Sequence, residues 1–128
     1  MDQELIYRAS MLERQSQEAE GKIDFVNQQI QELGRFQENL DIFIASKDTE
    51  MFSSLGKGVH VKANLSSKNL LVEVGAGVIV KKDAKDMKEI ISSQIKKFRE
   101  VKNHIYAEME DYNAQLSEIM AQVETSKD

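Results

Sequence analysis

The chain has 128 residues, of which 41% are hydrophobic but only 6% aromatic, and its formal net charge is −5 at pH 7. It contains no cysteine, which excludes a disulfide framework, a cysteine-based metal site and a thiol nucleophile. The acidic balance argues against nucleic-acid binding, and no run of about 18 apolar residues is present that could span a membrane.

The first 46 residues are predicted to form one long helix. Apolar residues recur in alternating steps of four and three, which is the 3.5-residue period of a coiled coil. No proline interrupts the pattern, and Gly21 and Gly34 are the residues least suited to a helix interior. Ten of the twelve positions in this series are apolar, the exceptions being Ser16 and Gln37. We call the series the first seam, and it consists of Leu5, Ala9, Leu12, Ser16, Ala19, Ile23, Val26, Ile30, Leu33, Gln37, Leu40 and Ile44.

The middle of the chain, residues 50–82, is predicted to form two β-hairpins built on one template. Apolar and polar residues alternate with a period of two. Two glycine pairs, Gly56 with Gly58 and Gly75 with Gly77, interrupt this alternation at matching places, where a turn or bulge is expected. The polar stretch at 66–69 is suited to a turn between the two halves. Strands are therefore expected near residues 51–55, 59–65, 70–74 and 78–81.

Two short hairpins cannot hide both of their faces and all of their edges, so we expect them to associate with hairpins of other chains. Residues 51–83 are also the basic part of the chain, with five basic and two acidic side chains. Four of the lysines, Lys57, Lys62, Lys81 and Lys82, are interpreted as solvated residues that discourage aggregation at strand edges. The oligomerisation surface is expected to consist of the alternating apolar side chains Val59, Val61, Leu65, Leu70, Val72, Val74, Val78 and Val80.

Residues 83–126 are predicted to form a second long helix, for which Asp83 is a suitable N-cap. Its apolar residues follow the same alternating steps, and ten of twelve positions are again apolar. This second seam consists of Ala84, Lys88, Ile91, Ile95, Phe98, Lys102, Ile105, Met109, Tyr112, Leu116, Ile119 and Val123.

The two predicted helices have equal lengths and a compact connection, so they are expected to pack antiparallel. Residues whose numbers sum to about 128 then lie side by side, as Ile23 would lie beside Ile105 and Ile30 beside Phe98. The same register places Glu32 opposite Lys96 and Asp41 opposite Lys88, and Glu38 and Lys97 are expected as a further pair of opposite charges. The expected fold class is α+β, with a long antiparallel two-helix coiled coil and two central β-hairpins that assemble into a β-barrel platform.

The stretch LGKGVHVKANLSSKNLLVEVGAGVIVKKDAKDMKEI, residues 55–90, carries a resemblance to a known family. Together with the flanking helices, it resembles the alpha class of prefoldin, in particular the archaeal type, over essentially the whole chain. That class has two hairpins where the beta class has one. One departure is visible: the family commonly has a Val-Pro pair before the first glycine pair, whereas residues 52–55 here read FSSL.

The resemblance implies a single prefoldin-like domain over residues 1–128 that acts as a cytoplasmic, ATP-independent chaperone subunit without a cofactor. In this family two alpha and four beta subunits join their hairpins into a double β-barrel. Six coiled coils project from the barrel, and their tips hold unfolded client polypeptides and deliver them to a group II chaperonin.

The resemblance places the client-binding surface at the open end of the coiled coil. The last turns of a coiled coil lack neighbours on one side and fray, which exposes seam residues, and methionine adapts to varied clients. Several weak contacts at several tips would bind by multivalency. The expected client-binding residues, whose simpler interpretation is coiled-coil packing, are Leu5, Ile6, Met11, Leu12, Leu116, Ile119, Met120 and Val123.

An alternative function in another class is a structural scaffold that self-associates through its hairpins into filaments, without client transfer. An enzyme is not expected, because no catalytic constellation is recognisable and the Gly-x-Gly pairs lack the context of a P-loop. His60 and His104 are far apart in sequence, so no metal site is expected. The acidic N-terminal stretch lacks the features of a secretory signal, which favours a cytoplasmic location without membrane contact.

Overall fold

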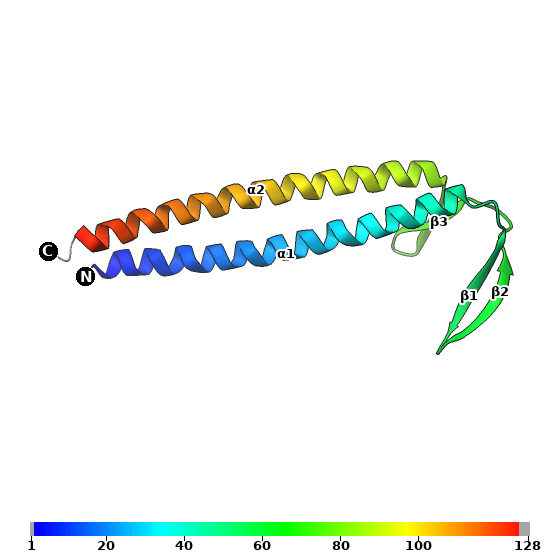
Figure 1. The fold of residues 1–128 in the computed structure, drawn as a ribbon, viewed down its shortest axis with the longest axis horizontal. Helices are drawn as coiled ribbons and strands as arrows, with labels where there is room; N and C mark the ends of the chain where they lie inside the picture. The colour runs from blue at the N-terminus through cyan, green and yellow to red at the C-terminus, as the bar shows by residue number, and fades with distance from the viewer. Residues whose placement is uncertain (1, 126–128) are drawn as a thin grey trace. The chain divides into compact units, whose positions relative to one another are not determined.

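The computed structural model describes residues 2–125, which form two compact units. We call residues 2–32 together with 95–125 the terminal unit, and residues 33–94 the hairpin unit. Two long helices contribute to both units, and the four strands belong to the hairpin unit (Figure 1). The elements in chain order are α1 (Gln3–Ala45), β1 (Glu50–Gly56), β2 (Val59–Asn64), β3 (Leu70–Gly75), β4 (Val78–Lys82) and α2 (Ala84–Thr125).

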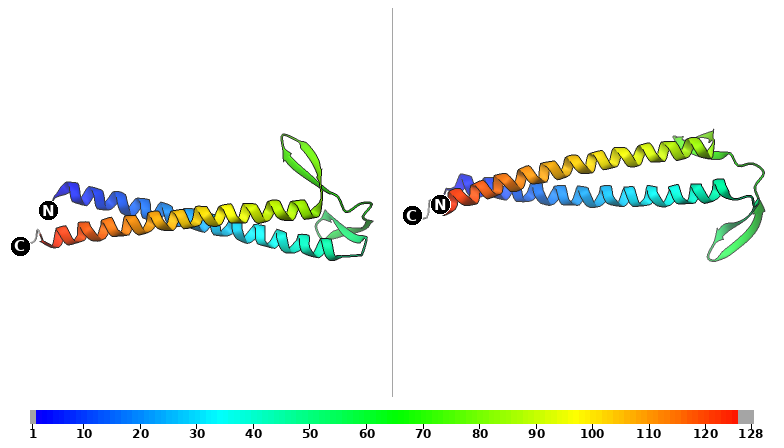
Figure 2. Two further views of the ribbon diagram at one scale, coloured as in Figure 1. Left: turned by 90° about the horizontal axis from the view of Figure 1, so that it is seen from above. Right: turned by 45° about the horizontal axis from the view of Figure 1, so that its top comes forward.

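Within the terminal unit, the two helical segments lie side by side and antiparallel, with both chain ends at the same end of the unit (Figures 1 and 2). Their core combines Ala19, Ile23 and Val26 of α1 with Ile105 of α2. This is the predicted antiparallel register, in which Ile23 and Ile105 lie at the same level. Further side chains pack partly buried against this core: Ile30, Phe98, Met109 and Tyr112.

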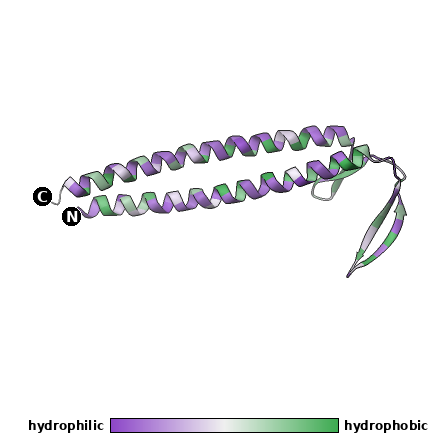
Figure 3. Ribbon diagram, viewed as in Figure 1, coloured by the Kyte–Doolittle hydropathy of each residue, from purple (hydrophilic) through white to green (hydrophobic). Residues whose placement is uncertain are grey.

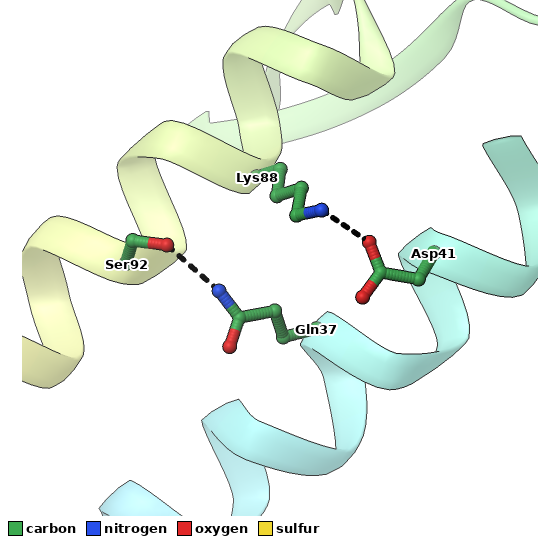
Figure 4. Close-up of polar contacts among 4 residues, drawn as sticks. All are labelled: Gln37, Asp41, Lys88 and Ser92. Carbon is green, nitrogen blue, oxygen red and sulfur yellow. Dashed lines mark hydrogen bonds and ion pairs between the residues drawn. The ribbon is translucent and has the colours of Figure 1, made fainter.

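The hairpin unit keeps the same register between its helical segments. Gln37 Nε2 donates a hydrogen bond of 2.7 Å to Ser92 Oγ, and Lys88 Nζ lies 2.5 Å from Asp41 Oδ1 (Figure 4). In each of these two pairs the residue numbers sum to 129, which differs by one from the sum of about 128 that defines the predicted register. Both ion-paired side chains are about half exposed, so the pair helps to define the register but adds little stability.

The expected set of charge pairs was only partly correct. Among residues 2–125, Asp41 and Lys88 form an ion pair, whereas Glu32 and Lys96 do not. The third pair, Glu38 and Lys97, does not fit the register, since its residue numbers sum to 135 rather than about 128. Exposed charges in water gain too little from pairing to offset the side-chain entropy that pairing removes.

The seam predictions agree with the burial of the side chains. Every position of the first seam is buried or half-buried, and so is every position of the second seam except Lys88. The predicted N-cap is also present, since Lys85 N donates to Asp83 Oδ1 at 3.3 Å. Asp2 has the same role at the start of α1, where it accepts a bond of 3.0 Å from Glu4 N. Residues 1 and 126, the outermost of the expected helix bounds, lie outside the described residues.

The strands form two separate antiparallel hairpins, within a residue or two of the predicted bounds. The first strand is seven residues long although the usual Val-Pro pair is missing. In each hairpin the register shifts just before a two-residue turn, after Ser54 and after Glu73. Both hairpins therefore follow one template, as the repeated sequence predicts.

Within each hairpin, the two glycines of the predicted pair occupy different positions. The first member of each pair, Gly56 or Gly75, is the last residue of a strand. The second member, Gly58 or Gly77, lies outside the strands and is the second residue of the tight turn. The φ angles are positive at all four, with values of 107° at Gly56, 78° at Gly58, 126° at Gly75 and 76° at Gly77. Glycine adopts such angles without steric cost, which explains the repeated pairs.

Candidate assembly and client-binding surfaces

The first hairpin has one largely apolar face. Residues that pair across two strands project to the same side of the sheet, so Met51 shares a face with Ala63, and Ser53 shares it with Val61. The opposite face carries the pairs Phe52–Lys62 and Ser54–His60, and is mainly polar. Figure 3 shows hydrophobic residues, in green, on both strands of this hairpin. Met51 and Val61 are nevertheless exposed, as are Leu55 and Val59 near the turn.

The second hairpin carries apolar side chains on both faces. Val72 pairs with Val80 on one face, and both are half-buried. On the other face Leu71 pairs with Lys81 and Glu73 with Ile79, which leaves Leu71 70% and Ile79 62% exposed. Two exposed aliphatic side chains give the second face of this short hairpin an apolar surface as well.

The expected oligomerisation residues are all exposed or half-buried. Leu71 and Ile79, which a strict alternation assigns to solvent, are further exposed aliphatic residues outside the expected set. The signal was present in the sequence, since the alternate positions of the second hairpin are also partly apolar. Exposed members of the expected set are Val59, Val61, Val74 and Val78, and half-buried members are Leu65, Leu70, Val72 and Val80.

We call the end of α1, the connection to β1 and the loop at residues 65–69 the joint. It contains a basic residue, Lys68, whose contacts the sequence did not predict. Lys68, in the loop between the hairpins, donates from Nζ to the carbonyl oxygen of Phe43 at 3.1 Å and to that of Ser46. The ammonium also lies 5.5 Å from the centre of the Phe43 ring. No local pattern could have revealed this contact, because its partners are 22 and 25 residues away along the chain.

The open end of the terminal unit exposes three of the expected client-binding residues. Ile6, Met11 and Met120 are between 40% and 59% exposed. Leu12 and Ile119 are buried, so they could meet a client only if the end of the coiled coil opened. The other expected residues, Leu5, Leu116 and Val123, are half-buried. A shallow hollow beside Met120 on α2 is lined by Asn113, Leu116, Ser117, Met120, Ala121 and Glu124.

Metal-ligating residues and membrane spans can be assessed for the described part of the chain. Within residues 2–125, no group of three His, Asp or Glu side chains is placed to hold a metal ion. In the same part of the chain, neither helix has a stretch apolar and long enough to cross a membrane.

The architecture defines the class of protein. An antiparallel pair of long helices, joined through two short hairpins with exposed apolar faces, is typical of a coiled-coil subunit that assembles through its β-strands. The family model for prefoldin subunits matches residues 12–127. The chain therefore belongs to the prefoldin family, which is a family of chaperone-associated subunits and not of enzymes.

Individual relatives agree with this family and with the alpha type. The chain is 25% identical over 122 residues to prefoldin subunit alpha of Methanobrevibacter smithii, covering 94% of this chain and 84% of the relative. Its fold is similar to a chain in the cryo-EM structure of filamentous PFD from Methanocaldococcus jannaschii, with a TM-score of 0.74 and 14% identity. That similarity covers 91% of this chain and 98% of the other. The chain is an alpha-type prefoldin subunit, and membership of this family implies assembly with other prefoldin subunits.

Proposed function

We propose that the chain is the alpha subunit of a hexamer of two alpha and four beta subunits, which captures unfolded polypeptides without ATP and delivers them to a group II chaperonin in the cytoplasm. The family and the alpha type support this proposal. The stoichiometry, the clients and the chaperonin are the parts of it that need experiment.

The single observation that carries the assembly step is the exposure of the hairpins. Val61, Leu71, Val74, Val78 and Ile79 are all at least 44% exposed, although they are aliphatic residues in strands. Burying one such side chain contributes roughly 1.5–3 kcal/mol, so a hairpin that docks with partner strands gains enough to order the contact. The strand edges that are unpaired within residues 2–125 supply the backbone groups for this docking.

The client-binding step is supported by the off-seam residues at the open end. Ile6, Met11 and Met120 are exposed and lie outside the two seams. Each offers a small apolar area that binds weakly, and the two copies of this chain in the proposed hexamer present two such ends beside the four tips of the other subunits. Several weak contacts give avidity and still permit release.

The assembly proposal is tested by native mass spectrometry of the complex isolated through a tag on this chain. We expect a hexamer that contains two copies of this 14.6-kDa chain and four copies of a smaller subunit with one hairpin. A series of masses that are pure multiples of this chain would contradict the hexamer.

The client-binding proposal is tested by replacing Ile6, Met11 and Met120 together with serine in the assembled complex. The readout is the aggregation of a guanidine-denatured model protein, followed by light scattering. We expect its suppression to weaken by about two- to threefold, because the two tips that this chain contributes to the hexamer lose their apolar contacts. The matched control is Phe25→Ser, which changes an equally exposed residue of the same unit about 20 Å further along α1. Undiminished capture by the triple variant, or an equal loss in the control, would contradict the proposed site.

A second candidate function is a filament built from this chain alone. The similar fold in filamentous PFD and the apolar second face of the β3–β4 hairpin favour it. In that case the isolated chain should form filaments visible by electron microscopy, and the triple tip variant should form them as well as the wild type. A chain that stays in small species at high concentration would contradict this function.

A further inference from the structure

The loop between the two hairpins is tied to the end of α1 by one side chain. The loop spans residues 65–69, between the end of β2 and the start of β3. Lys68 reaches from this loop to two backbone carbonyls at the helix terminus, those of Phe43 and Ser46, and its ammonium lies over the Phe43 ring. All of these residues belong to the hairpin unit.

The end of α1 needs such a partner. The last carbonyls of a helix have no hydrogen-bond donor inside the helix, and they form the negative end of its dipole. The last turn of α1 has no basic side chain of its own. The carbonyl of Ile42 is satisfied by Ser46 N at 2.9 Å, whereas that of Phe43 is satisfied by Lys68. A lysine from a distant loop therefore supplies the positive charge that the helix lacks.

A second contact holds the other side of the same joint. Leu65 N, at the start of the loop, donates a hydrogen bond of 2.7 Å to the carbonyl oxygen of Thr49, just before β1. The connection between α1 and β1 is also braced internally, because Asp48 N bonds Ser46 Oγ at 3.3 Å and Glu50 N bonds Asp48 Oδ1 at 3.1 Å. The loop thus contacts this connection at two points, through Leu65 and through Lys68.

The joint has little apolar packing that could replace these contacts. A hollow of about 240 Å³ lies between the end of α1 and the start of β1. Its lining includes Ile42, Phe43, Met51 and Leu65 together with Lys68 itself. Ile42 and Met51 are exposed, so the side chains around the hollow do not close over it. The orientation of the hairpins on α1 therefore depends on a few directed polar contacts.

We propose that Lys68 is a positioning residue for subunit assembly: by joining the loop between the hairpins to the terminus of α1, it presents both hairpins in the orientation in which partner strands dock. This rests on the proposed assembly function. The physical reason is pre-organisation, since a hairpin that is already oriented loses less freedom when its partner binds.

The contact itself is tested on the isolated chain with an amine-acetylating reagent, followed by peptide mass spectrometry. Two hydrogen bonds to carbonyl oxygens engage the protons of Lys68, so we expect its acetylation to be roughly tenfold slower than that of Lys47. Lys47 is the matched comparison, because it is exposed in the same joint and makes no hydrogen bond or ion pair within residues 2–125. Equal acetylation rates for the two lysines would show that Lys68 does not bind the carbonyl oxygens at the end of α1.

The positioning role is tested in the assembled complex with Lys68→Met, Lys68→Arg and the control Lys47→Met. We expect Lys68→Met to weaken assembly by about five- to tenfold, measured by mass photometry on dilution, with recovery in Lys68→Arg and no change in Lys47→Met. The helical circular dichroism of the isolated chain should stay unchanged because the seams are intact, and its unfolding midpoint should fall by no more than about 4 °C through the loss of the charge at the end of α1.

The remaining outcomes decide against the role. If Lys68→Met lowers the unfolding midpoint by more than about 4 °C and assembly falls in parallel, the residue is merely stabilising. If it leaves assembly unchanged, or if the two methionine variants behave alike, Lys68 does not position the hairpins. If the wild-type chain does not assemble with other subunits, the proposed function is wrong. The acetylation rates then still decide whether Lys68 contacts the end of α1.

Discussion

Replacing glycine by alanine should have opposite effects at two kinds of position in this chain. Gly21 and Gly34 lie inside α1, where glycine is the least suitable residue other than proline. An alanine Cβ at either position would have no atom within 4 Å, so it would meet no steric obstacle. Gly21→Ala and Gly34→Ala should therefore each stabilise the helix.

The expected gain comes from helix propensity alone. Alanine is favoured over glycine by about 0.8–1.0 kcal/mol in a helix interior, so the double variant should gain close to 2 kcal/mol. The two positions are about 20 Å apart along α1, which is far enough for their effects to add. For a chain of this length, such a gain corresponds to an increase in the unfolding midpoint of roughly 5–10 °C.

Gly75→Ala should act in the other direction. The site is equally open, with no atom within 4 Å of an added Cβ, but its φ angle of 126° lies outside the regions that an alanine adopts. The cost is backbone strain of roughly 1–3 kcal/mol, confined to the β3–β4 hairpin. The helices should remain intact while assembly through this hairpin weakens.

The assay is thermal unfolding followed by circular dichroism at one fixed protein concentration, because subunit association makes the midpoint depend on concentration. Assembly of the Gly75→Ala variant is compared with wild type by mass photometry. If the helix double variant is no more stable than wild type, α1 is not continuous through these glycines. If Gly75→Ala assembles like wild type, the hairpin does not require the positive φ angle there.

Two other substitutions test the helix packing and the helix start. Ile105→Ala should destabilise the chain by about 2–5 kcal/mol in urea unfolding, because it leaves a cavity in the core of the terminal unit, whereas Phe25→Ala at an exposed site should cost less than about 1 kcal/mol; equal effects would contradict the assigned core. Asp83→Ala should cost about 1 kcal/mol and speed amide hydrogen exchange at Lys85, whose N–H loses its acceptor. Unchanged exchange at that amide would show that Asp83 does not cap α2.

The sequence predicted the helices well because their packing depends on a local repeat. A 3.5-residue period places Ile23, Val26 and Ile105 on narrow stripes, and two stripes of equal length can match in one antiparallel register. The Asp41–Lys88 pair and the Gln37–Ser92 bond both follow that register. The repeated glycines predicted the turns in a similar way, because positive φ angles at a tight hairpin favour one residue type.

The sequence predicted the hairpin surface only in part. Alternation assigned Leu71 and Ile79 to solvent, because a period of two assumes one buried face. The cross-strand pairing shows that they lie on the second face of a hairpin whose first face is also apolar. Which of the two faces a partner covers depends on other chains, and a single sequence does not contain that information.

By itself, then, the sequence determined the two seams, their antiparallel register, the turns and the likeness to prefoldin, since each depends on residues close together or on a regular repeat. The seams also separate Leu12 and Ile119, which are buried at the open end, from the off-seam residues Ile6, Met11 and Met120, which are exposed. Only the tertiary structure decided that Lys68 meets the terminus of α1. That contact joins residues more than 20 positions apart through an irregular loop, and a directed hydrogen bond to one carbonyl oxygen leaves no periodic trace in the sequence.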